Sequence, residues 1–66
     1  MIHQITEDQV GKPIWFMKQT NEQEEGRIKS FNNEERFAWV VYRCAGNWPL
    51  YEHFTAQRTQ YSDLTF

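Results

Sequence analysis

Cys44 and His53 are the residues of this 66-residue sequence whose types could support catalysis. A cysteine thiol next to a histidine can act as a nucleophile activated by a base. The sequence has a single cysteine, however, and it stands at the end of an apolar, strand-like run. A cysteine in that setting is more often a small buried hydrophobe, so we expect a protein that is not an enzyme.

Metal or cofactor binding has equally little support in the sequence. Zinc sites need several Cys or His ligands at short spacings, and Cys44 with His3 and His53 gives no such spacing. The three glycines, Gly11, Gly26 and Gly46, are isolated and form no phosphate-binding loop. We therefore expect no metal and no cofactor.

Aromatic residues dominate what remains, with five Phe, three Trp and three Tyr. Each large ring buries roughly 150–250 Å², which suits a single small domain over residues 1–66. A core of this size rarely contributes more than about 3–5 kcal/mol of net stability without a disulfide or metal. Some rings are therefore candidates for a surface completed by a partner or by a second copy of the chain, and a homodimer remains open.

Charge and hydropathy limit the function classes further. A net charge of −2 argues against a strong non-specific nucleic-acid binder, which needs a basic field. No run of about 18 apolar residues is present, so we expect no membrane span. The first residues lack the cationic start and apolar centre of a signal peptide. A lone thiol also fits a reducing compartment, and we expect a cytosolic protein.

Alternating β-prone and polar stretches predict a mainly β domain. Gly26 inside the second expected strand indicates a bulge, a bend or a close backbone approach. Thr6 and Gln9 suit a capped turn that Gly11 ends. The predicted strands are residues 14–17, 24–31, 37–44 and 50–58, and the predicted short helical turns are residues 6–11 and 59–64, followed by a last extended pair.

Several short motifs resemble a group of small phage and prophage proteins. The matching pieces carry an E-E-G-x-I-x-S-F strand, a V-V-Y strand and a closing T-A and D-L segment, at residues 10–14, 24–31, 39–42, 55–56 and 62–64, with residues 44–48 and Tyr51 between them. The resemblance implies an SH3-like antiparallel β-barrel of four to five strands. It assigns no biochemical role, and fold alone does not supply one.

The same resemblance orients the strands. Its members often carry a polar residue at the Val41 position, which implies that Ala38, Val40 and Tyr42 face the interior. An outward apolar surface would follow as the first candidate for partner binding or dimerisation, formed by Trp15, Met17, Trp39 and Val41. The alternative is that loops cover both faces of so small a barrel.

The loop before the fourth predicted strand holds the second candidate. Trp48 and Tyr51, with His53 and Phe54 beside them, could grip a proline ridge or a cation. The alternative is that Trp48 is a lid on the barrel and that Tyr51 packs on it.

Basic residues give the third candidate. Arg27, Lys29, Arg43 and Arg58, with Trp39 or Tyr51 for base stacking, would resemble a platform for single-stranded nucleic acid. Glutamates lie close in sequence to these cations, so salt-bridged strand faces are the commoner outcome. The preferred hypothesis is a phage accessory protein that binds, and modulates or inhibits, a host protein; nucleic-acid binding is the alternative.

Overall fold

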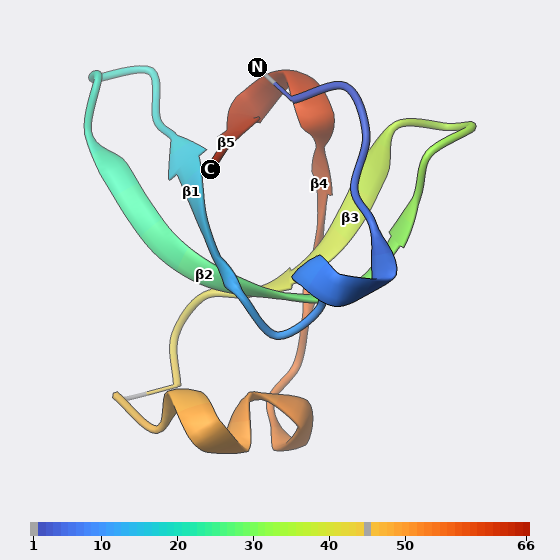
Figure 1. Ribbon diagram of the computed structural model, residues 1–66. Coiled ribbons are helices and arrows are strands. Elements are labelled where there is room, and N and C mark those ends of the chain that lie inside the picture. The colour runs from blue at the N-terminus through green and yellow to red at the C-terminus, as the bar shows by residue number, and fades with distance from the viewer. Residues whose placement is uncertain (1, 45) are drawn as a thin grey trace.

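One antiparallel sheet makes up most of the structure. The computed structural model describes residues 2–44 and 46–66, so Met1 and Ala45, the latter in the expected turn-rich loop, lie outside the described residues. The sheet has five strands in the order β4-β3-β2-β1-β5 (Figure 1). Their bounds are β1 Pro13–Met17, β2 Gln23–Asn32, β3 Phe37–Val41, β4 Gln57–Gln60 and β5 Leu64–Thr65, and the 3₁₀ turns are η1 Glu7–Gln9, η2 Trp48–His53 and η3 Tyr61–Asp63. The expectation of a mainly β fold is confirmed.

The sheet curves around its core but does not close into the expected barrel (Figure 1). β4 and β5 occupy its opposite edges, and no ladder joins them within residues 2–44 and 46–66. The chain passes from one edge to the other through the short η3 turn. β5 is only two residues long, and both of its residues pair with β1. It therefore leaves an open seam between the two edges.

β2 is the strand that both halves of the sheet share. Its first part pairs with β1 from Gln23 to Arg27, and its second part pairs with β3 from Arg27 to Asn32. Gly26 lies just before this change of partner. A Cβ placed there would be 2.5 Å from Val40 Cγ1 and 3.0 Å from the Val41 carbonyl oxygen. The expected close backbone approach is confirmed, while the register shift of a bulge falls later, between Ile28 and Ser30.

The core lies on the concave face of the sheet. Ala38 and Val40 are fully buried, and Tyr42 packs against their cluster, as the predicted orientation requires. Phe16 packs against the same cluster. The fully buried cluster consists of Ile5, Ile14, Ile28, Ala38, Val40, Tyr61 and Leu64.

Asn33 ties the N-terminal segment and η3 to the turn after β2. Its side-chain amide donates to the Ile5 carbonyl oxygen and its Oδ1 accepts from the Ile5 N–H, both at 2.9 Å. The Tyr61 hydroxyl donates to the same Oδ1 at 2.6 Å. These bonds satisfy polar groups that the sheet ladder leaves free.

Both predicted helical turns are present. The Gln9 side chain accepts from the Thr6 N–H at 2.9 Å, and Gly11 has the left-handed φ of +82°. The region predicted as the fourth strand is different, because residues 48–53 form η2 and the strand begins only at Gln57. Pro49 explains the change, since proline lacks a donor for a ladder but fits the first turn of a helix. β3 also ends earlier than expected, at Val41.

The close approach at Gly26 yields a prediction for stability. Gly26→Ala should lower the free energy of unfolding by about 1–3 kcal/mol, because the new methyl group overlaps Val40 and the β3 backbone. Urea unfolding of the variant and of the exposed-strand control Ser30→Ala measures the effect, and the control should change stability by less than about 0.5 kcal/mol.

Val40→Ala removes the Cγ1 atom that the new methyl group would meet. In a double-mutant cycle, the two substitutions together should therefore cost less than the sum of their separate costs, by about 0.5 kcal/mol or more. Strict additivity would mean that Gly26 does not lie against Val40.

Candidate partner-binding surface

The convex face of the sheet carries the first set of predicted binding residues. Trp15, Met17 and Trp39 all point to this face, because they alternate with Ile14, Phe16 and Val40 on the core side. Met17 is 37% exposed and Trp39 is 41% exposed. The predicted orientation of these three residues is confirmed.

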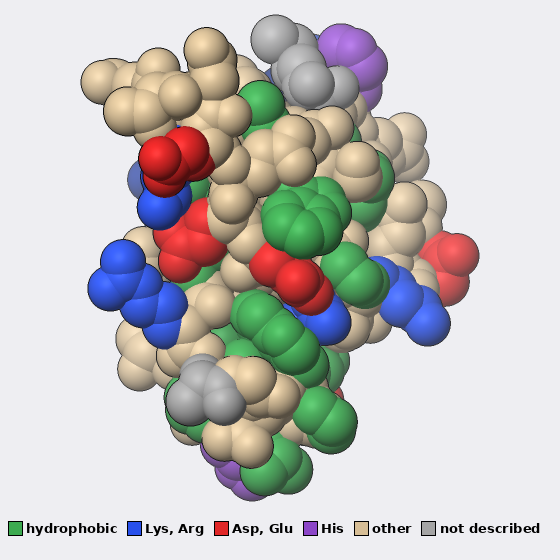
Figure 2. Space-filling model, turned by 90° about the vertical axis from the view of Figure 1, so that its left-hand side faces the viewer, with side chains coloured by type: hydrophobic (Ala, Val, Ile, Leu, Met, Phe, Trp, Pro, Cys, Tyr) green, Lys and Arg blue, Asp and Glu red, His purple; other side chains and the backbone are tan. Residues whose placement is uncertain are grey.

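These residues do not form one continuous patch. β2 lies between β1 and β3, and the register places Trp15 opposite Glu25 but Trp39 opposite Ser30. On the side of the molecule drawn in Figure 2, hydrophobic side chains form separate small areas with Lys, Arg, Asp and Glu side chains between them. The expectation of a single apolar surface on strands β1 and β3 is wrong.

Val41 is the clearest correction. It points to the convex face as predicted, yet it is 0% exposed, and Cys44 is buried beside the end of the same strand. The segment that carries η2 folds back over this end of the face, where η2 contacts β2 (Figure 1). Lys29 holds the end of that segment by donating from Nζ to the Phe54 carbonyl oxygen at 3.1 Å. The alternative that a loop covers the convex face is therefore correct at Val41.

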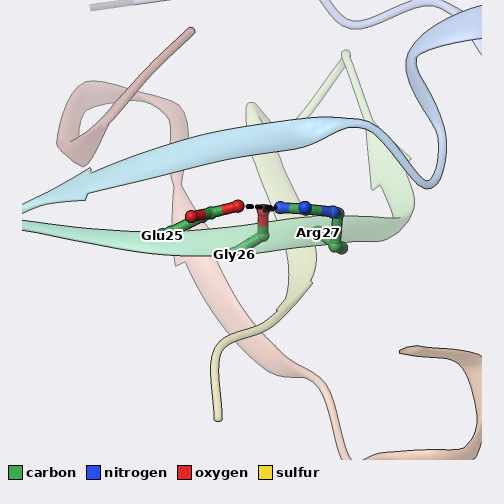
Figure 3. Close-up of polar contacts among 3 residues, drawn as sticks. All are labelled: Glu25, Gly26 and Arg27. Atoms are coloured by element: carbon green, nitrogen blue, oxygen red, sulfur yellow. Dashed lines mark hydrogen bonds and ion pairs between the residues drawn. The ribbon is translucent and has the colours of Figure 1, made fainter. Parts of the chain in front are cut away.

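Arg27 fastens η2 to the sheet. Its guanidinium lies 2.5 Å from Glu25 Oε2 and also donates to the Gly26 carbonyl oxygen (Figure 3). The Trp48 ring covers the guanidinium, with the Arg27 Cζ atom 4.3 Å from the ring centroid. Only 14% of the Arg27 side chain is exposed. Arg27 and Trp48 are thus bound to each other, which opposes a free role for either in ligand binding.

Tyr51 also has an intramolecular partner. A Cβ added at Gly11 would lie 3.0–3.2 Å from the Tyr51 hydroxyl and ring, so the ring packs against the backbone at that glycine. Burial and the nearby charge of Glu52 raise the pKa of the Tyr51 phenol. Trp48 therefore contacts the sheet through Arg27, and Tyr51 contacts Gly11. Both rings have partners within the chain, but Tyr51 lies against Gly11, whereas the lid alternative placed it on Trp48.

The four cations of the nucleic-acid hypothesis do not gather at one place. Arg27 contacts Glu25, whereas Arg43 lies 3.6 Å from Glu24, and these neighbouring glutamates point to opposite faces of β2. Arg58 lies 3.9 Å from Glu35. The alternative of salt-bridged strand faces accounts for three of the four residues.

A groove beside Trp39 remains open on the convex face. It is shallow and widely open to solvent, with a volume of about 690 Å³, and it is lined by Lys29, Ser30, Trp39, Thr55 and Ala56. The Trp39 ring meets the Phe37 ring edge to face, with centroids 6.1 Å apart, and the Arg58 guanidinium covers Phe37. Phe37 and Arg58 therefore support the exposed indole from one side.

Sequence reasoning missed Thr55 and Ala56 as groove residues, because it placed them inside a strand. The sequence feature that could have identified them is the Thr-Ala pair that matches the phage-like pattern. In the structure this pair lies in the segment between η2 and β4 and lines the groove.

The candidates for catalysis and metal binding are not assembled into a site. Cys44 is buried, whereas His53 is exposed on η2. Among residues 2–44 and 46–66, no three His, Cys, Asp or Glu side chains are grouped to hold a metal ion. In the same residues, no helix has the length and apolar character needed to cross a membrane.

Comparisons with protein-family models, with curated proteins and with solved structures found no match.

The Arg27 contacts predict that removing the charge of Arg27 lowers stability more than removing the charge of Arg43. Arg27→Met should lower the free energy of unfolding by about 1–2 kcal/mol, because it removes a partly buried ion pair and the cation–π contact with Trp48. Arg43→Met makes the same charge change at a side chain that is 88% exposed and should cost less than about 0.5 kcal/mol. Thermal and urea unfolding of both variants measure the difference, and equal losses would contradict the assigned role of Arg27.

Proposed function

We propose that this chain is a non-enzymatic binding module that takes a short segment of a partner protein into the groove at Trp39. The carrying observation is the exposed indole in a shallow groove that stays open to solvent. Tryptophan is enriched among residues that dominate binding energy, because it combines a large apolar area with one hydrogen-bond donor. Phe37 and Arg58 already hold the ring, which lowers the entropy lost on binding.

A short segment fits this surface better than a second copy of the chain. A stable interface takes about 800 Å² from each partner, which is about a sixth of the 4662 Å² surface of this chain. The exposed large apolar residues lie on different elements, namely Met17 on β1, Trp39 on β3, Leu50 on η2 and Phe66 at the C-terminus. Such scattered residues favour a small contact centred on Trp39 over a wide isologous face.

The proposal includes the origin and finer fold that the sequence motifs suggest. We infer an SH3-like arrangement encoded by a phage or prophage, acting in the bacterial cytosol on a host protein. Two features of the fold support the SH3-like assignment, namely the pairing of the last short strand with the first and the single 3₁₀ turn before it. A small stoichiometric modulator or inhibitor needs only a stable fold and one such surface.

Nucleic-acid binding is the competing function, and the cations around Trp39 are the reason to test it. Lys29 lines the groove, and Arg58 is the cross-strand neighbour of Trp39. Both have intramolecular contacts, to Phe54 and to Glu35 and Phe37. Binding to phosphates would release counterions and weaken steeply with salt, whereas apolar burial would not.

Selection from a random peptide library on the immobilised chain tests the proposed function. Enriched peptides should bind the wild-type chain and lose about 30-fold in affinity for Trp39→Gln, because a central tryptophan contributes about 2 kcal/mol or more. Met17→Gln is the matched control, since it removes a similarly exposed apolar side chain from the same face, and it should leave the affinity within about twofold.

The selected peptides should keep their affinity between low and high salt. Equal binding by the wild type and Trp39→Gln, with both variants folded by circular dichroism, would contradict the proposal. Tight, salt-sensitive binding of a single-stranded oligonucleotide that Trp39→Gln abolishes would favour the nucleic-acid alternative instead.

Light scattering checks the preference for a foreign partner. The free chain should have the 8.0 kDa mass of a monomer at both low and high salt, because no wide apolar face is available for self-association. A salt-insensitive dimer that Trp39→Gln dissociates would show that a second copy occupies the groove.

A further inference from the structure

The open seam of the sheet contains a pocket on the core side, away from the Trp39 groove. It is half open to solvent and has a volume of about 290 Å³, at the lower limit of sites for small ligands. Its walls come from segments far apart in the sequence: Phe16 on β1, Glu24 on β2, Tyr42 after β3, Thr59 on β4 and Asp63 on η3. The pocket exists because β4 and β5 are not paired across the seam, among the residues described.

Two aromatic rings form one corner of this pocket. The Phe16 and Tyr42 rings meet at 64° with their centroids 5.8 Å apart, and both are only partly buried. A hydrogen bond of 2.7 Å between the Tyr42 hydroxyl and Thr59 Oγ1 fixes the orientation of the phenol. Rings held at such an angle offer an apolar surface to an alkyl chain and a negative ring face to a cation.

The pocket is lined by two acidic residues and one basic residue. Glu24 and Asp63 are its two carboxylates, and Asp63 forms no ion pair within the described part of the chain. Arg58 is the one basic residue that lines the pocket there, but its guanidinium lies over Phe37. Phe37 and Arg58 belong to the convex side of the ladder, so the charge of Arg58 points away from the pocket.

Glu24 is less available to a bound cation than Asp63, because it already has cationic partners. Lys18 Nζ and Arg43 Nε each lie 3.6 Å from its carboxylate. The Glu24 side chain is 24% exposed and lies between these two cations, so its charge is partly neutralised. Burial raises the pKa of the Tyr42 phenol, and the charges of Glu24 and Asp63 raise it further.

We propose that this pocket binds the cationic side chain of a lysine or arginine from a partner polypeptide. The alkyl part would lie against Phe16 and Tyr42, and the charged group would reach Asp63, with Glu24 as the second carboxylate. A charge-assisted hydrogen bond to Asp63 would give the site its preference for a cation over an apolar side chain. This inference does not depend on the Trp39 groove, because the two sites lie on opposite faces of the sheet.

The test is a titration of the ¹⁵N-labelled full chain, followed by amide chemical shifts. The probes are N-acetyl-lysine methylamide, N-acetyl-arginine methylamide and the neutral N-acetyl-norleucine methylamide. At least one cationic probe should bind with a dissociation constant on the order of 1–10 mM, shifting the amides of Phe16, Tyr42, Thr59 and Asp63. The norleucine probe should bind at least about tenfold more weakly.

Asp63→Asn keeps the shape of the side chain and removes its charge, and it should weaken the cationic probe about tenfold. Glu34→Gln is the matched control, because it makes the same change of net charge at an exposed position in the turn between β2 and β3; it should leave binding unchanged. The proposal is overturned if norleucine binds as well as the cations, if Asp63→Asn binds normally, or if no probe shifts these amides. Shifts confined to residues of the Trp39 groove would also overturn it.

Discussion

The missing side chain at Gly26 is the constraint on which this structure depends. β2 is a ten-residue strand that pairs with β1 at one end and β3 at the other. At the change of partner, β3 comes so close that Val40, Val41 and Tyr42 occupy the space of a Cβ. Only glycine allows this approach without displacing the neighbouring strand, and the approach lets one small sheet curve around a single core.

The curvature gives the two faces of the sheet different roles. The concave face is filled by aliphatic side chains and Tyr61, and a pocket opens at the seam beside β4. The convex face is divided by the η2 segment, which covers Val41 and leaves Trp39 in the open. Arg27 keeps η2 in this position, because it contacts both Glu25 on β2 and Trp48 on η2. Both proposed sites are therefore spaces that the covering elements do not reach.

Much of the fold follows from local sequence rules. The strands at β1, β2 and β3, the capped first turn and the role of Gly26 could be predicted from β-prone runs, Gln9 and isolated glycines. The path of residues 48–56 could not, because apolar residues such as Leu50 and Tyr51 suit a strand as well as a 3₁₀ turn. That difference explains the errors at Val41, Thr55 and Ala56. The divided apolar surface has another cause, because β2 lies between β1 and β3. The side-chain contact between Arg27 and Trp48 could not be predicted either, because it forms only when η2 folds back onto β2.

The most direct test of this account is the nuclear Overhauser effect between the Gly26 Hα protons and β3 in the labelled wild-type chain. The account predicts strong cross-peaks from Gly26 Hα to the Val40 methyl groups and to the Tyr42 ring, because these atoms fill the place of the absent Cβ. If Gly26 Hα shows no cross-peaks to either residue, the backbone at Gly26 does not lie against Val40 and Tyr42. The curved sheet, and with it the open Trp39 groove and the seam pocket, would then be contradicted.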